Sequence, residues 1–175
     1  SGNTNVELKG EGVHVYSVVG GGLVDEDEGA ANVGKNTNIT ISGGAWAGDT
    51  EVSSSQPDKI AVAGGGHILS NDPSMIGTNS DIKTATTNVG GEVHITLNGI
   101  TGNLVDCIVG GCYDAGKSNA EKITGTTGPV KIDIDNCRFE SQFHRIFGGG
   151  YVAWGGNNRD IQVKGNVEIT VDHST

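Results

Sequence analysis

The sequence has little of what identifies several common protein classes. Among its 175 residues there are only three prolines and three cysteines, and aromatic residues make up 5%. No stretch approaches the roughly 20 consecutive apolar residues of a membrane-spanning helix, so we expect no membrane insertion. The cysteines lack the C-x-x-C spacing of zinc sites, and we expect small, buried thiols at Cys107, Cys112 and Cys137. Whether two of them pair in a disulfide stays open.

Basic residues are also scarce. The chain has 11 Lys and Arg against 21 Asp and Glu, a formal net charge of −10. Nucleic acids and anionic membranes would repel such a surface, so we expect neither as a partner. The five histidines form no H-x-H or H-E-x-x-H string, and we expect no metal and no cofactor. The densest acidic run, Asp25 to Glu28, lacks the spacing of an EF-hand; we expect a solvated loop tip and leave calcium binding open.

Glycine, in contrast, is abundant, with 30 residues and no G-x-y period that would indicate collagen. Many of the glycines recur in one kind of string: an apolar pair, a glycine cluster and then a bulky residue. These strings are SVVGGGLV (17–24), AVAGGGHIL (61–69), CIVGGCYD (107–114) and RIFGGGYV (145–152). Glycine costs conformational entropy in a strand, so its recurrence at one place indicates a geometric need.

A second motif precedes each glycine cluster and closes the chain. It reads NVELKG (5–10), NITISG (38–43), HITLNG (94–99), KIDIDN (131–136) and EITVDH (168–173). Apolar residues two apart are typical of a β-strand with one buried face. Most copies then reach Gly or Asn, which tolerate a positive φ at a sharp turn. A recurring strand, turn, second strand, glycine cluster and variable loop is typical of a solenoid.

The repeat predicts stacked parallel strands with residues of like position in columns. One column should contain Ile39, Ile95, Ile132 and Ile169, and a second Val18, Val62, Ile108 and Ile146. Gly20, Gly64, Gly110 and Gly148 should stack at one corner. We further expect costly backbone angles at Gly149 or Gly150. Because Cys112 replaces the last glycine of its cluster, we expect Gly150→Ala to be mild and Gly149→Val severe. A sandwich of antiparallel hairpins is the alternative fold.

The strings NITISGG and IFGGGY resemble motifs of the adhesin-like right-handed parallel β-helix repeat proteins on the surfaces of gut and rumen bacteria. The resemblance covers nearly the whole chain and implies an all-β fold: one right-handed parallel β-helix domain over residues 1–175, with about four to five coils and variable loops. Together with the regular strands, the variable loops and the lack of a catalytic constellation in the sequence, it favours a non-catalytic, extracellular or cell-surface module that presents loops to a glycan or to a host or cell-surface protein. The last repeat stops after EITVDHST, so we expect part of a longer surface protein.

Aromatic residues give the candidate binding site. Tyr113 and Tyr151 share one repeat position with Leu23 and His67, and Trp154 lies close by. Exposed rings stack on sugar faces and anchor protein interfaces. We therefore name Tyr113, Tyr151 and Trp154 as candidate binding residues. The alternative interpretation is that these rings cover the ends of the apolar core.

Two other functions stay open. Parallel β-helices include polysaccharide lyases and hydrolases, and an enzyme of that kind could use Asp133, Asp135, Arg138 or Arg145. Asp133, however, aligns with threonines in other repeats, which is typical of an ordinary outward-facing position. We therefore name no catalytic residue. A third interpretation is a structural spacer that holds other domains away from the cell.

Overall fold

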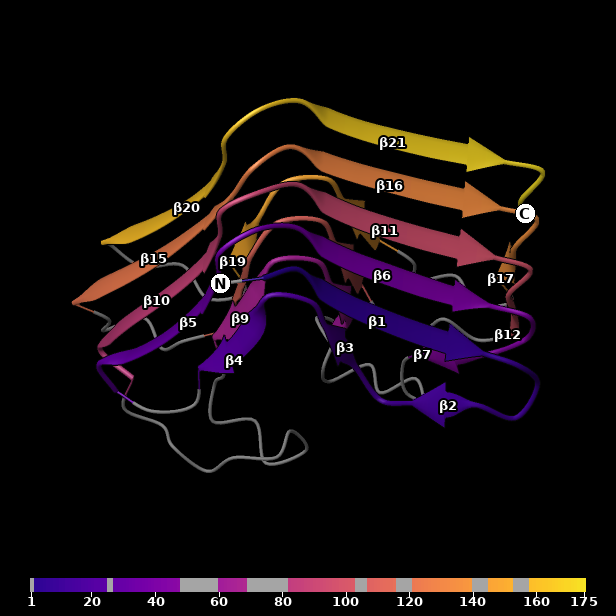
Figure 1. Ribbon diagram of the computed structural model, residues 1–175, viewed down its shortest axis with the longest axis horizontal. Helices are drawn as coiled ribbons and strands as arrows, with labels where there is room; N and C mark the ends of the chain where they lie inside the picture. The colour runs from indigo at the N-terminus through magenta and orange to yellow at the C-terminus, as the bar shows by residue number, and fades with distance from the viewer. Residues whose placement is uncertain are drawn as a thin grey trace.

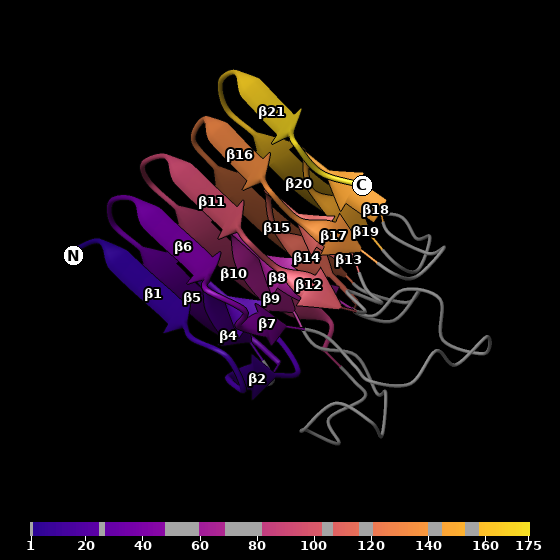
Figure 2. The same cartoon turned by 90° about the vertical axis from the view of Figure 1, so that its right-hand side faces the viewer.

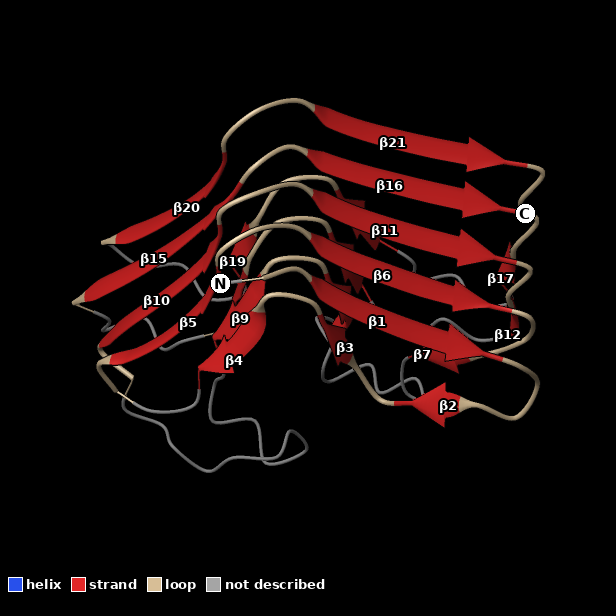
Figure 3. Ribbon diagram, in the orientation of Figure 1, coloured by secondary structure: helices blue, strands red, loops and turns tan. Residues whose placement is uncertain are grey.

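The computed structural model describes residues 2–24, 27–47, 60–68, 82–102, 107–115, 121–139, 145–152 and 158–175. Within this part the secondary structure consists of β-strands, with no helix (Figure 3). The strand pairs between neighbouring repeats are parallel. The protein is therefore all-β and parallel, and the antiparallel sandwich is excluded for the described strands.

Five strands follow one another in each of four repeats. Repeat 1 contains β1 (Thr4–Lys9), β2 (His14–Val15), β3 (Val18–Val19), β4 (Gly22–Val24) and β5 (Gly29–Val33). Repeat 2 contains β6 (Thr37–Ser42), β7 (Trp46–Ala47), β8 (Ile60–Ala63), β9 (Gly66–Ile68) and β10 (Thr84–Val89). Repeat 3 contains β11 (Val93–Asn98), β12 (Thr101–Gly102), β13 (Cys107–Val109), β14 (Tyr113–Asp114) and β15 (Lys122–Thr127). Repeat 4 contains β16 (Val130–Asp135), β17 (Arg138–Phe139), β18 (Arg145–Phe147), β19 (Tyr151–Val152) and β20 (Arg159–Val163), and β21 (Val167–Asp172) follows it.

Strands of like position in successive repeats form the sheets. The longest sheet has the order β1-β6-β11-β16-β21, and three four-stranded sheets have the orders β5-β10-β15-β20, β3-β8-β13-β18 and β4-β9-β14-β19. Each repeat thus passes through the same sheets and lies on the one before it, as the stacked ribbons of Figures 1 and 2 show.

Both predicted apolar columns are confirmed. Register pairs join Ile39 to Ile95, Ile95 to Ile132 and Ile132 to Ile169 on adjacent parallel strands. The first three are fully buried, whereas Ile169 on the edge strand β21 is 42% exposed. The second column is in register from Val18 through Val62 and Ile108 to Ile146. The period-two pattern places these side chains on one face, and stacking then buries them.

The turn that follows each strand of the longest sheet uses a left-handed residue. The φ angles are 108° at Gly10, 64° at Gly43, 68° at Gly99, 53° at Asn136 and 46° at His173. Glycine and asparagine adopt this region readily. The prediction that Gly and Asn serve these turns is therefore confirmed, and histidine replaces them in the last turn.

The predicted stacking of Gly20, Gly64, Gly110 and Gly148 is also confirmed. The N–H of Gly64 donates to the carbonyl of Val109 at 2.8 Å, and the N–H of Gly110 donates to the carbonyl of Phe147 at 2.7 Å. A Cβ on Gly64 would lie 2.7 Å from the carbonyl oxygen of Gly110. Close approach of backbones from neighbouring repeats therefore requires glycine here.

The expectation of costly backbone angles at Gly149 or Gly150 is wrong. Neither residue has a positive φ. A Cβ on Gly149 would meet nothing within 4 Å, whereas a Cβ on Gly150 would lie 2.1 Å from Cγ2 of Ile161. The constraint is therefore steric, and Gly150 is the more restricted of the two.

The cysteines behave as expected for small core residues. Cys107, Cys112 and Cys137 are free and buried. Burial raises the pKa of the Cys112 thiol, which therefore stays protonated at neutral pH.

Candidate functional site

The sheet β4-β9-β14-β19 carries a column of rings on its outward face. His67, Tyr113 and Tyr151 are in register, so the repeat position predicted from the sequence is a true spatial column. The Tyr113 and Tyr151 rings stack with centroids 5.7 Å apart and an interplanar angle of 5°. His67 lies 4.8 Å from Tyr113, and Phe147 lies 4.6 Å from Tyr151. We call His67, Tyr113 and Tyr151, together with Phe147 on the neighbouring strand β18, the aromatic column. The strand spacing brings the rings of the three register partners into stacking range.

The members of the aromatic column differ in exposure. Tyr113 is only 3% exposed and His67 only 2%. Tyr151 and Phe147 are half-buried. Tyr113 is therefore a packing residue, and of the two tyrosines only Tyr151 keeps part of its surface exposed. Trp154 lies outside the described residues, and the binding role of all three residues stays a prediction.

His67 is a buried titratable group inside this column. Burial lowers the pKa of its imidazole to about 4, so the ring is neutral at neutral pH. Its Nε2 has no hydrogen-bond partner among the residues that the structure describes. A buried nitrogen without a partner costs free energy, so the packing of the rings must offset this loss.

A buried ion pair lies beneath the aromatic column. Nη1 of Arg159 in repeat 4 donates to Oδ2 of Asp114 in repeat 3. The Asp114 side chain is fully buried and that of Arg159 is 4% exposed. Sequence reasoning missed this pair, although a signal was present. Asp114 aligns with the apolar Ile68 and Arg159 with the apolar Ile123, so two charges replace core residues.

Asp27 has a structural role in the acidic run. Its Oδ1 accepts hydrogen bonds from the backbone N–H groups of Lys83 and Thr84, both at 2.8 Å, and of Glu28 at 3.1 Å. These bonds hold the pKa of Asp27 below its usual value, those from Thr84 and Lys83 most strongly. The carboxylate thus joins repeat 1 to the start of β10. Residues 25–26 lie outside the described part of the chain, and calcium binding there stays open.

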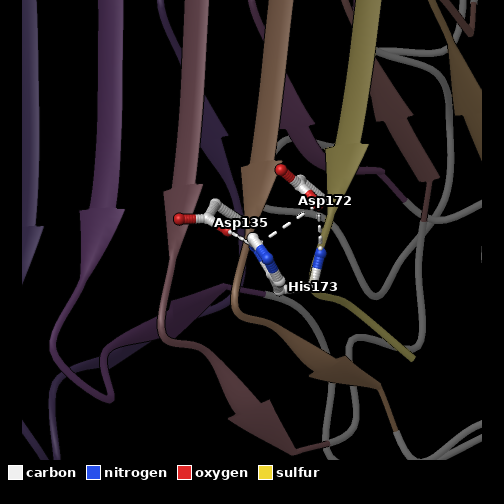
Figure 4. A group of neighbouring side chains, drawn as sticks. All are labelled: Asp135, Asp172 and His173. Carbon is white, nitrogen blue, oxygen red and sulfur yellow. Dashed lines mark hydrogen bonds and ion pairs between the residues drawn. The ribbon is translucent and has the colours of Figure 1, made fainter.

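A second group of titratable side chains lies at the carboxyl ends of β16 and β21 (Figure 4). Asp135 and Asp172 are register partners, and Nδ1 of His173 lies 3.2 Å from Oδ1 of Asp135 and 3.3 Å from Oδ1 of Asp172. All three side chains are exposed. Two carboxylates and an imidazole suit a divalent transition metal, but His–Asp ion pairs account for the same geometry. Sequence reasoning did not single out this group, although the aligned strings KIDIDN and EITVDH already place Asp135 opposite Asp172.

The residues proposed for an enzyme have other partners in the structure. Oδ2 of Asp133 lies 3.1 Å from Nζ of Lys131 on its own strand, and Asp135 contacts His173. Asp133 is in register with Thr96 and Thr170, as the sequence alignment predicted. Arg138 on β17 and Arg145 on β18 are both exposed. Asp133 and Asp135 therefore form ion pairs with different residues and do not act as one carboxylate pair.

No protein-family model, curated protein or solved structure matches this chain. The described residues include no helix with the length and apolar character needed to cross a membrane.

Proposed function

We propose that the chain is a right-handed parallel β-helix module of a cell-surface protein, and that it binds a glycan or a protein without catalysing a reaction. The in-register parallel strands of successive repeats support the fold. Crossovers between parallel strands are nearly always right-handed, which supports the handedness. The strings NITISGG and IFGGGY support the relation to adhesin-like repeat proteins and hence an extracellular location.

One observation carries the binding function: along the sequence, the connections before and after the strand pairs that bear the aromatic column differ in length between repeats. On one side the connections to the next strand are residues 25–28, 69–83, 115–121 and 153–158. On the other side they are residues 16–17, 48–59, 103–106 and 140–144. The strands between them are parallel and in register from repeat to repeat, apart from one shift between Cys107 and Ile108 where β13 pairs with β8. Constant strands with variable connections are typical of scaffolds that present binding loops.

The chemistry of this region favours a sugar. Aromatic faces stack on the apolar faces of pyranose rings, and Tyr151 offers a ring that is half-buried on a rigid strand. The net charge of −10 disfavours acidic polysaccharides, so we propose a neutral glycan in preference to a uronic acid polymer.

A glycan array probed with the intact chain tests this proposal. We expect neutral glycans to bind and Tyr151→Ala to weaken binding at least several-fold. His94→Ala is the control, because the His94 ring is exposed and lies on β11 of the longest sheet, which carries no member of the aromatic column. Thermal melts of both variants confirm that they fold. The absence of any bound glycan, or equal binding by the two variants, would contradict the glycan proposal.

The enzyme and the spacer are the alternative functions. A turnover assay on acidic polysaccharides separates them from the binding module. Product formation that is lost in Asp135→Asn would favour a lyase or hydrolase. A chain that neither binds nor turns over any polysaccharide or protein would favour the spacer.

A further inference from the structure

Asn98, at the carboxyl end of β11, is the one asparagine of the chain that a glycine follows. Its side chain is exposed on the outer face of the longest sheet, where β11 lies between β6 and β16 (Figure 1). This exposure is therefore a property of the face and not of a terminal strand. The neighbouring strands carry Ser42 and Asp135 at the same position, so repeat 3 alone combines a side-chain amide there with a following glycine.

Gly99 leaves the backbone nitrogen next to this amide uncrowded. The nitrogen of the following residue can attack the side-chain carbonyl of an asparagine and close a cyclic imide, and a branched side chain on that residue hinders the attack. Gly99 has no side chain, and a Cβ there would meet nothing within 4 Å. Its φ of 68° also places it in the turn and not in the regular strand. The amide and its potential nucleophile are thus adjacent and accessible.

Other asparagines of the chain are protected in two ways. A β-branched residue follows Asn3, Asn5, Asn32, Asn36, Asn38, Asn88 and Asn166. Hydrogen bonds between repeats also hold several of the amides: Nδ2 of Asn38 donates to Oδ1 of Asn5 at 2.7 Å, and Nδ2 of Asn88 donates to Oδ1 of Asn32 at 2.9 Å. An amide that is held in this way resists the rotation that would bring its Cγ to the next nitrogen. These residues are an internal reference for Asn98.

We propose that Asn98 is a self-modifying site, which converts without an enzyme to aspartate and isoaspartate. The nitrogen of Gly99 gives up its proton and forms a bond to Cγ of Asn98, the Cγ–Nδ2 bond breaks, and the amide nitrogen leaves with that proton as ammonia. Water then opens the cyclic imide. Cleavage at Cγ gives aspartate, whereas cleavage at the backbone carbonyl leaves the chain running through the side chain as isoaspartate. Water is the only co-reactant, and nothing is oxidised or reduced.

The fold controls the rate of this conversion through one hydrogen bond. The N–H of Gly99 donates to the carbonyl of Asp135 at 3.1 Å, so the nitrogen is free to attack only when the turn after β11 opens. Local opening of a turn costs less free energy than unfolding of the whole domain. The conversion therefore proceeds in the folded protein, more slowly than in denaturant. It also accelerates as the pH rises, because the deprotonated nitrogen is the nucleophile.

The product weakens the contact between repeats 3 and 4. Asn98 is in register with Asp135, and Asp135 with Asp172, so conversion adds a third carboxylate to one column. Like charges side by side on neighbouring strands are destabilising. Isoaspartate also adds a carbon to the backbone and displaces the N–H of Gly99 from the carbonyl of Asp135. Modified copies are therefore more acidic than the net charge of −10 and less stable.

Ageing of the intact chain at physiological temperature and mildly basic pH tests the site. We expect ion-exchange chromatography to resolve a more acidic species that grows with time, and peptide mass spectrometry to locate the exchange of –NH2 for –OH at Asn98, with Asn88 unchanged. Gly99→Asn is the matched variant, because Asn136 has the same left-handed position in repeat 4, with a φ of 53°. Its side chain crowds the nitrogen and should slow conversion at least several-fold, and a thermal melt confirms that it folds. Conversion of Asn98 no faster than that of Asn88, or equally fast conversion in Gly99→Asn, would overturn the proposal.

Two substitutions at position 98 test the effect on stability. Asn98→Ser introduces the residue that repeat 2 has at this position, Ser42, and should stay homogeneous on ageing. Asn98→Asp carries the charge of the product. It should melt at a lower temperature than Asn98→Ser, by a difference that shrinks as salt screens the carboxylates. Equal melting temperatures of the two variants at low salt would overturn the weakening of the contact between repeats 3 and 4.

Discussion

Cys112 lies directly against Gly125. In the other repeats the position of Cys112 is a glycine and the position of Gly125 carries a side chain, so repeat 3 has the large and the small residue the other way round. A Cβ on Gly125 would lie 2.7 Å from Cβ of Cys112 and 3.1 Å from its Sγ. In the other repeats the glycine is on the opposite side: Gly22 meets Ala31, Gly66 meets Thr87 and Gly150 meets Ile161. The volume shared by each such pair thus holds one side chain, supplied from either strand.

This exchange predicts a strong coupling between the two positions. Gly125→Thr alone should cost about 1–3 kcal/mol of unfolding free energy, because the new side chain overlaps Cys112 and also Cδ1 of Ile161. Cys112→Gly alone should also destabilise, because it leaves a cavity and frees the unfolded backbone. The double variant gives the two positions the residues of repeat 2 and should recover part of the loss, because Cδ1 of Ile161 still lies close to position 125; we expect a coupling of about 0.5–3 kcal/mol. Urea denaturation of the four proteins measures it; simple additivity would show that the two side chains do not share one space.

The glycine cluster of repeat 4 predicts unequal responses to alanine. Gly149→Ala should change the unfolding free energy little, because its Cβ meets open space. Gly150→Ala should cost about 1–3 kcal/mol, because its Cβ overlaps the branched side chain of Ile161. Ile161→Ala in the Gly150→Ala background should relieve part of this overlap. Thermal melts compare the variants. A larger loss for Gly149→Ala would restore backbone strain as the explanation.

The buried ion pair predicts different results for single and double replacement. Asp114→Ala should cost about 3–5 kcal/mol, because the buried guanidinium of Arg159 loses its carboxylate. Replacing both residues by the apolar side chains of neighbouring repeats, as Asp114→Ile with Arg159→Ile, should be close to neutral or stabilising. Guanidinium denaturation would give the free energies. If the double variant were as unstable as Asp114→Ala, the attraction between the two charges would stabilise the fold by more than the desolvation of both charges costs.

The buried imidazole of His67 predicts a pH dependence of stability. Its pKa is about 4 in the folded protein, below the ordinary value of 6.5. The unfolded chain therefore binds the proton first, and stability falls as the pH decreases from 6.5 toward 4, by on the order of 3 kcal/mol. Below pH 4 this contribution is constant. His67→Phe should remove this part of the slope, and the exposed His94→Phe is the control. Equal slopes in all three proteins would contradict the burial of His67.

The repeating strands were predictable from the sequence, because the period of two and the recurring Gly or Asn turn are local properties of the chain. Aligning the motifs also predicted the register of Ile39, Ile95 and Ile132. Which atoms lie between strands of different sheets is not a local property. For this reason the sequence did not show that Ile161 fills the space beside Gly150. The need for glycine there was attributed to backbone angles, whereas a side-chain contact causes it.

The candidate site was predictable only in part, for the same reason. The alignment located Tyr113 and Tyr151 in one column, but the position within a repeat does not tell what covers the outward face, and Tyr113 is buried. The pair of Asp114 with Arg159 joins different sheets of different repeats. The only signal for this pair in the sequence is that Asp114 and Arg159 occupy positions where aligned repeats have isoleucine.

Whether two matched side chains belong to one repeat or to two has a consequence for how such a chain can gain or lose repeats. Cys112 and Gly125 belong to one repeat, as do Gly22 with Ala31, Gly66 with Thr87 and Gly150 with Ile161. Each steric match therefore travels with its own repeat when a gene segment is duplicated or lost. Asp114 lies in repeat 3 and Arg159 in repeat 4. Repeats 3 and 4 must therefore be duplicated or lost together if the ion pair is to be kept. Recombination at the boundary between repeats 2 and 3 preserves all of these matches, whereas recombination between repeats 3 and 4 separates two buried charges.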